Sequence, residues 1–186
     1  MKPLVDQLSQ YASYHRDRRN IATHLVGIPM IVCGIEAMLA RASLSAQGWT
    51  LSLALGGTLA ATVFYFALDR RYGVAMAGFL GASLWIGTSL AALSTAAWLL
   101  AFAILFVVGW AIQFVGHAFE GRKPAFLDDL VGLLVGPLFI VAEVGFALGL
   151  RNDVRQEMER RVGPTRLGRM GRSPRAPTSA PHPGGV

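Results

Sequence analysis

Three histidines and one glutamate are the residues of this chain whose types and spacing could hold a metal ion. His117 and Glu120 are three positions apart, so on a helix they share a face, where both could bind one ion or the carboxylate could orient the imidazole. His24 lies in a second apolar stretch, and His15 stands nine residues before it. Ionisable side chains in apolar segments are costly, which makes them candidate functional residues.

A bend in the chain is needed before His15 and His24 can reach the same ion. On one straight helix the two side chains would point in opposite directions about 13 Å apart, and we expect the bend at residues 17–20. Two or three imidazoles and a carboxylate, with open positions, suit ferrous iron that must bind oxygen. The spacing supports a small metal site, for which we expect Fe(II); hydrogen-bonded packing is the alternative for each histidine. The expected ligands are His15, His24, His117 and Glu120.

The remaining unusual residues have less specific explanations. Glu36 and Glu143 also lie in apolar stretches, where a carboxylate serves either a hydrogen bond between helices or a functional site. Cys33 is the single cysteine, so no intrachain disulfide can form. His182 falls in the polar C-terminal part, where we expect it to be solvated. The sequence has no phosphate-binding glycine loop, no nucleophile elbow and no HxxxH or HxxHH box of the membrane desaturases.

The composition is that of a membrane protein. Hydrophobic residues make up 53% of the 186 residues and charged residues 15%, against roughly 25% charged in ordinary soluble domains. A spanning helix needs about 20 mostly apolar residues, and the stretches that qualify are residues 21–40, 49–68, 74–93, 97–119 and 130–150. We therefore predict an all-α polytopic membrane bundle with four to five transmembrane segments, and one membrane-embedded catalytic domain over residues 1–150.

The distribution of positive charge predicts where these segments meet. Arg and Lys favour the cytoplasmic side, which places the Arg-rich N-terminal segment and the Arg70-Arg71 connection on one face. Two further crossings return the chain to that face at His117. After residue 150, eight Arg and three acids give a net charge of +5 that also favours the cytoplasm. Five full crossings would put this part outside, so we favour four crossings plus one segment broken or re-entrant at Gly136-Pro137, because proline removes a backbone donor.

The two ends of the chain differ in character. Leu4, Leu8, Tyr11 and His15 recur at helical spacing, which predicts an amphipathic N-terminal helix at the membrane interface. Residues 151–186 form a polar basic tail, which we expect to be disordered from about residue 163 and dispensable for catalysis, because its composition cannot bury enough apolar area. Basic clusters beside membrane segments contact anionic lipid headgroups, so membrane lipid, and not nucleic acid, is the expected partner. The sequence does not indicate an oligomeric state.

Two stretches carry a resemblance to a known family. The first is Tyr14-His15-Arg16, followed by residues 20–24, Asn-Ile-Ala-Thr-His, and residues 27–29, Gly-Ile-Pro. The second is residues 113–125, Gln-Phe-Val-Gly-His-Ala-Phe-Glu-Gly-Arg-Lys-Pro-Ala. Over residues from about 11 to 150, their order and spacing resemble the small membrane family typified by the yeast 2-hydroxy fatty acid dioxygenase of α-oxidation.

The resemblance implies an Fe(II)- and O2-dependent dioxygenase that shortens 2-hydroxy fatty acids by one carbon at the membrane. The expected partners are therefore a 2-hydroxy fatty acid, O2 and membrane lipid. The positions that match the family's motifs are His15, His24 and His117, with Asn20, Glu120 and Pro124. We expect catalytic roles at four polar positions, of which the last two would steady the substrate carboxylate: Asn20, Glu120, Arg122 and Lys123.

Such a site could bind a 2-hydroxy acid through its carboxylate and α-hydroxyl as a chelating pair, with the alkyl chain lying between helices. A rival interpretation is a small transporter or membrane scaffold, in which intramembrane His and Glu serve proton transfer or packing. Metal content separates the two. The Arg- and Ala-rich sequence is typical of bacteria, so we expect an inner-membrane protein whose site faces the cytoplasm.

Overall fold

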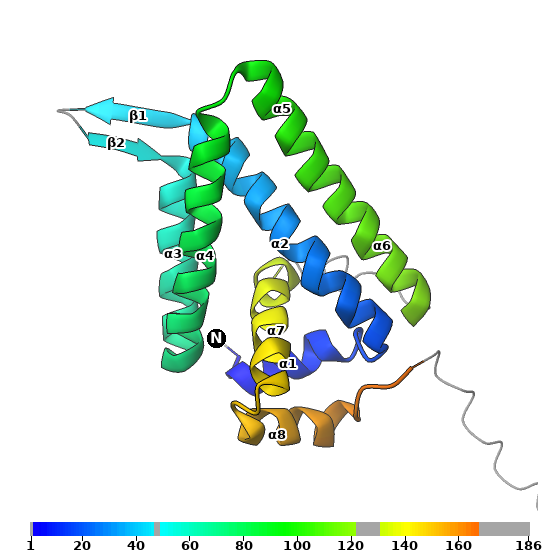
Figure 1. Ribbon diagram of the computed structural model, residues 1–186. Coiled ribbons are helices and arrows are strands. Elements are labelled where there is room, and N and C mark those ends of the chain that lie inside the picture. Colours follow the sequence, from blue (N-terminus) through cyan, green and yellow to red (C-terminus); the bar gives the residue numbers. More distant parts are fainter. Residues whose placement is uncertain (1, 47–48, 122–130, 168–186) are drawn as a thin grey trace, which may run out of the picture.

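The computed structural model describes residues 2–46, 49–121 and 131–167, and over these residues the protein is nearly all helix (Figure 1). Two short strands interrupt the helices and pair as an antiparallel hairpin, with Ser43 opposite Ser52. In chain order the elements are α1 (Leu4–Ala12), α2 (Arg18–Arg41), β1 (Ser43–Ala46), β2 (Trp49–Ser52), α3 (Leu53–Leu68), α4 (Arg70–Ala91), α5 (Thr95–Ala103), the π-helical turn η1 (Ile104–Val108), α6 (Gly109–Glu120), α7 (Gly132–Ala147) and α8 (Asn152–Val162).

Three of these helical stretches are long and apolar enough to cross a membrane. They are α2, α4 and the 26-residue run of α5, η1 and α6 from Thr95 to Glu120. Helix α3 is also apolar but has 16 residues, a rise of about 24 Å. Large apolar side chains such as Val63, Trp85 and Leu100 stay exposed on these helices, as expected where lipid is the solvent. The predicted class, a polytopic α-helical membrane protein, is confirmed.

Polar side chains set the helix boundaries. Asp17, Ser52, Asp69 and Ser94 each accept a backbone N–H in the first turn of the following helix, which supplies an acceptor that the helix itself lacks. Helix α6 ends at Gly121, whose φ of 70° lies in the left-handed region and whose N–H donates to the carbonyl of His117. These caps hold the turns that carry the site.

The structure corrects the start of the second predicted span. Residues 49–52, which we assigned to a transmembrane helix, form strand β2 instead. The Ser side chains that flank the hairpin favour caps and turns over helix interiors. Ser52 accordingly caps α3, with its hydroxyl accepting the N–H of Leu55 at 3.1 Å.

The last predicted membrane segment is bent, as expected, but the predicted position of the break at Gly136-Pro137 is wrong. Helix α7 runs through Pro137 without interruption, and the chain turns later, where α7 and α8 differ in direction by 114°. Pro137 lacks the N–H that would bind the carbonyl of Leu133, and Tyr65 of α3 donates its hydroxyl to the next carbonyl, that of Leu134, 2.8 Å away. The turn itself uses positive φ angles at Gly149 (76°) and Arg151 (52°).

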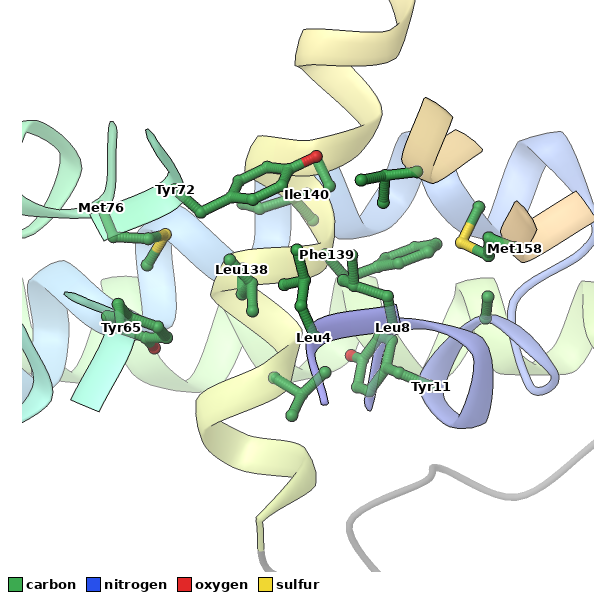
Figure 2. Packing of buried hydrophobic residues seen from close by; sticks show 14 of the residues in the cluster. Leu4, Leu8, Tyr11, Tyr65, Tyr72, Met76, Leu138, Phe139, Ile140 and Met158 are labelled. Atoms are coloured by element: carbon green, nitrogen blue, oxygen red, sulfur yellow. The ribbon is translucent and has the colours of Figure 1, made fainter. Parts of the chain in front are cut away.

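Helices α1, α7 and α8 meet in an apolar core below the bundle. Leu4 and Leu8 of α1 and Met158 of α8 surround Phe139 of α7 (Figure 2). The expected apolar face of the N-terminal helix is therefore buried against protein. The segment after residue 150 begins as helix α8 and continues in place to residue 167, where Arg166 bonds to Arg16 and Arg18. Residues 163–167, where we expected disorder to begin, are thus held in place, and residues 168–186 lie outside the described part.

One end of the molecule collects the turns that matter for the site. Figure 1 shows the α3–α4 turn, the end of α6 and helices α1 and α8 at the end opposite the hairpin. Arg151, in the turn before α8, forms an ion pair with Asp69, in the turn before α4, with Nη1 3.0 Å from Oδ1. The N-terminal segment and the end of α6 therefore meet, as the charge distribution predicts.

Candidate metal centre

Three histidines from distant parts of the chain converge in the protein. His15 lies in the turn between α1 and α2, His24 in the second turn of α2, and His117 in the last turn of α6. One ring nitrogen from each lies within 4.8 Å of the others, and all three residues are buried. The chain bends at residues 13–17, slightly before the predicted position, because Asp17 caps α2. This bend brings His15 back toward His24.

Hydrogen bonds fix the proton on two of the rings. His15 donates Nδ1–H to the carbonyl of Tyr11 at 2.8 Å, and His24 donates Nδ1–H to the carbonyl of Asn20 at 2.9 Å. Each Nε2 therefore carries a bare lone pair. Metal-binding histidines almost always hold their second nitrogen in this way.

The two bare nitrogens face each other at a distance that suits two ligands of one cation. The Nε2 atoms of His15 and His24 are 3.0 Å apart, yet with both protons at Nδ1 neither nitrogen can donate, so this contact is not an ordinary hydrogen bond. Two nitrogens bound at about 2.1 Å to one ion, at a right angle, are about 3.0 Å apart. The pair thus has the spacing of two neighbouring metal ligands.

His117 supplies a third unsatisfied group. Its Nδ1 is buried without a hydrogen-bond partner among the described residues, and its ring centroid lies 5.1 Å from that of His15 and 5.0 Å from that of His24. A buried polar atom left unpaired is costly and calls for an explanation. Three imidazole nitrogens fit a divalent transition metal, although imidazole alone does not choose iron over zinc, copper or nickel.

The surroundings keep His15 neutral, as a metal ligand must be. Burial and the neighbouring His24 hold the pKa of His15 well below its ordinary value. The ring of Tyr11 stacks on it with centroids 4.2 Å apart and planes 4° from parallel, and Phe139 lies 5.7 Å away. Aromatic rings thus wall off this side of the cluster from water.

Glu120 lies beside the cluster and binds backbone groups instead of pointing at the three nitrogens. Its Oε2 accepts the N–H groups of Arg16 at 3.0 Å and Asp17 at 2.8 Å, and the amide of Asn20 at 3.3 Å. These contacts tie the turn that carries His15 to the end of α6. Glu120 and Asn20 therefore hold the site together, and Glu120 is not among the residues whose ligand atoms converge.

Of the other predicted residues, some lie away from the three histidines and the rest lie outside the described part of the chain. Glu36 accepts a hydrogen bond from Thr58 at 2.8 Å, between α2 and α3, and has no contact with the cluster. Glu143 lies 3.8 Å from the guanidinium of Arg16. Arg122, Lys123, Pro124 and His182 lie outside the described residues.

Arg16 is a residue whose role the sequence did not reveal. Its side chain is 1% exposed, donates to the carbonyl of His15 at 3.1 Å and to that of Gly163 at 2.7 Å, and so connects the site turn to the C-terminal segment. From the sequence we expected it to be one of the charges that set the topology. Only its place directly after His15 could have singled it out.

An apolar cavity of about 260 Å³ opens from the cluster. It follows the facing sides of α2 and α6 from His24 and His117 to Ile35 and Phe106, and residues of α7 also line it. No charged side chain of the described residues lines it. A histidine cluster at the end of an apolar cavity inside a membrane protein is suited to a metal-dependent reaction on a lipid-like molecule.

Comparisons with known proteins agree with this class of site. Residues 1–148 match the family described as Mpo1-like, 2-hydroxy-palmitic acid dioxygenase Mpo1-like. The chain is 32% identical over 158 residues to the protein named 2-hydroxy-palmitic acid dioxygenase MPO1 of Saccharomyces cerevisiae, covering 84% of this chain and 87% of the yeast protein. No solved structure matches the chain. The protein belongs to the Mpo1-like family.

Proposed function

We propose that the protein is an Fe(II)-dependent dioxygenase that shortens 2-hydroxy fatty acids by one carbon. The observation that supports this most is the convergence of imidazole nitrogens at one end of an apolar cavity. The name of the yeast relative supports the substrate class. Ferrous iron, when bound, would supply the activation of oxygen, a chemistry that amino-acid side chains lack.

The protein's own residues have three tasks in this reaction. His15, His24 and His117 hold the metal, with the carbonyls of Tyr11 and Asn20 keeping the first two rings in the required tautomer. Glu120 and Asn20 keep the turn of His15 against α6. The apolar cavity takes the alkyl chain and excludes water from the reacting carbons. For Arg122 and Lys123, contact with the substrate carboxylate on entry stays a prediction from sequence.

Metal content and turnover test the proposal together. Protein purified anaerobically in detergent is expected to bind about one iron per chain and to convert 2-hydroxypalmitate with consumption of oxygen. His117→Ala should lose both properties while keeping its expression level. His182→Ala is the matched control, because it removes a histidine of the C-terminal tail, and should behave as the wild type.

The same measurements distinguish the dioxygenase from the rival interpretation, a transporter or scaffold. A transporter or scaffold of this family would contain no stoichiometric iron and would retain its fold in His117→Ala without any loss of metal. Wild-type protein without bound iron or turnover, under anaerobic preparation and iron addition, would refute the dioxygenase proposal.

A further inference from the structure

Gln113 carries a buried amide that has no hydrogen-bond partner in the described part of the chain. Its side chain is 3% exposed, and neither Nε2 nor Oε1 has a hydrogen-bond partner among the described residues. An amide that loses water without gaining a hydrogen bond is destabilising. Two unpaired atoms on one side chain, within an apolar helix, indicate a partner other than the described residues.

The position of Gln113 places it at the junction between the histidines and the apolar cavity. It precedes His117 by one turn on the same face of α6, and both residues line the cavity. On the facing helix α2, a Cβ atom at Gly27 would come within 2.9 Å of Nε2 of Gln113. The missing side chain at Gly27 is what gives the amide its room.

Helices α2 and α6 line the cavity in antiparallel order. His24 and His117 lie at one end, Ile28 and Gln113 come next, and Ile35 and Phe106 lie farthest away. Eleven residues separate His24 from Ile35, a rise of about 16 Å. A long-chain acyl tail can therefore extend along the apolar part while its first two carbons stay beside Gln113 and the histidines.

The chemistry of a primary amide matches that of a 2-hydroxy acid. The amide offers a donor at Nε2 and an acceptor at Oε1, two bonds apart. A 2-hydroxy carboxylate offers an acceptor on C1 and a hydroxyl donor on C2. No Arg or Lys among the described residues lines the cavity to dominate recognition through charge.

We propose that Gln113 recognises the 2-hydroxyl group of the substrate, with Oε1 accepting from the hydroxyl and Nε2 donating to a carboxylate oxygen. This rests on the proposed substrate class. An unsubstituted fatty acid would leave Oε1 buried and unpaired, and sites built to bind a hydroxyl discriminate strongly against analogues that lack it. Gln113 is thus a specificity-determining residue, distinct from the groups that hold the metal.

Equilibrium binding to protein in nanodiscs, with empty nanodiscs subtracted, tests this. The wild type should bind 2-hydroxypalmitate at least about tenfold more tightly than palmitate. Gln113→Met, which keeps the length of the side chain and removes its polar atoms, should bring this ratio near one. Gln113→Leu is a second apolar variant. Both should keep wild-type metal content and unfold at the same or a higher temperature, because an unpaired buried amide is removed.

The matched control is Ile35→Ala, at the far end of the cavity. This substitution reduces the apolar contact with the acyl tail. It should therefore weaken the binding of both acids by similar factors and leave the ratio of their affinities unchanged. A wild-type ratio that persists in Gln113→Met and Gln113→Leu overturns the inference, as does a wild type that binds both acids equally. Because binding is measured without turnover, an inactive protein that still shows a Gln113-dependent ratio would refute the dioxygenase proposal and keep this inference.

Discussion

At the scale of single residues, the cluster is organised by main-chain carbonyls. His15 and His24 each donate Nδ1–H to the carbonyl four residues earlier, so the local backbone fixes both tautomers without help from a second side chain. This leaves the carboxylate of Glu120 free for another task. It binds the two N–H groups at the start of α2, where the positive end of the helix dipole favours a negative charge.

Replacement of Glu120 should therefore weaken the metal site indirectly. Glu120→Ala removes the acceptor for three donors and loosens the turn of His15, for which a ten- to hundredfold loss of metal affinity is expected. Glu120→Gln keeps one carbonyl oxygen and should lose less. Titration with Co(II) measures the metal affinity of both variants.

The absorption spectrum of bound Co(II) distinguishes positioning from ligation. If Glu120 only positions the turn, saturated Glu120→Gln has the wild-type spectrum, since its ligand set is unchanged. A changed spectrum at saturation, with the same affinity loss in both variants, would make Glu120 a ligand after all.

The three histidines were predictable from the sequence because each stands in or beside an apolar segment, where an ionisable group is conspicuous. The hydrogen-bond partners of Glu120 could not be predicted. Helical spacing places Glu120 near His117, but it does not show that the turn at residues 13–17 lies beside this carboxylate. Gln113 opens the second stretch that carries the family resemblance, but its role could not be predicted from the sequence. A neutral amide draws attention only when the structure shows that nothing bonds to it.

At the scale of elements, residues 163–167, which follow α8, form a strap across the turn that carries His15. Arg166 donates its N–H to the carbonyl of Arg16 and accepts the N–H of Arg18, both at 2.8 Å, and the carbonyl of Gly163 accepts from Arg16. The boundary of the dispensable tail should therefore lie near residue 167, and not near residue 163.

Two truncations test the strap. Ending the chain after Leu167 should leave metal affinity and thermal stability unchanged. Ending it after Val162 removes the three hydrogen bonds to Arg16 and Arg18, each worth about 1 kcal/mol, and should lower the unfolding temperature in detergent and weaken metal binding. Equal stability of the two truncated proteins would show that the strap has no role.

The turns before α4 and α8 are joined by a pair of charges that makes stability depend on pH. Partial burial acts to raise the pKa of Asp69, but hydrogen bonds from the backbone N–H of Tyr72 and from Arg151 outweigh it and leave that pKa below its ordinary value. A carboxyl group with a lowered pKa in the folded protein stabilises it above the unfolded pKa. This stabilisation is lost as the pH falls through the folded pKa.

Asp69→Asn should remove this pH dependence. Asparagine still caps α4, so the loss at neutral pH should be about 1 kcal/mol or less, as for a partly exposed ion pair. Thermal unfolding from pH 7 down to pH 3 should show the wild type approaching the variant. Asp69→Ala is the comparison, because it also removes the cap and should cost about 1 kcal/mol more. A difference between wild type and Asp69→Asn that is constant with pH would contradict the assignment.

The type of an element could be predicted where its apolar run is long, but the residues at which elements begin and end could not. Composition identified α2, α4 and the run from Thr95 to Glu120, because about 20 apolar residues admit few other structures. Pro137 does not interrupt α7, where Tyr65 of α3 bonds to the neighbouring carbonyl of Leu134, a tertiary contact that local sequence does not encode. The hairpin was missed because apolar residues flank its few polar ones.

At the scale of the whole molecule, the fold brings the histidine cluster together from residues up to about a hundred positions apart. It does so by placing the α1–α2 turn, the α3–α4 turn and the end of α6 at the same end. Glu120 meets Arg16, Arg151 meets Asp69, and α1 packs with α8 in one core. The hairpin lies at the opposite end (Figure 1). This arrangement predicts which surfaces share an aqueous compartment.

Cysteine labelling in sealed vesicles tests that arrangement, after the single native cysteine is replaced by Cys33→Ala. Gln10→Cys on α1 and Arg71→Cys at the start of α4 are exposed at the site end, whereas Leu44→Cys lies in the hairpin, where the native side chain is 81% exposed. An impermeant thiol reagent should reach the first two from one side of the membrane and the third from the other, and the positive-inside rule predicts that the first two face the cytoplasm. Labelling of Gln10→Cys and Leu44→Cys from the same side would mean that α2 does not cross the membrane, and the apolar cavity along it would then lie outside the bilayer from which a fatty acid must come.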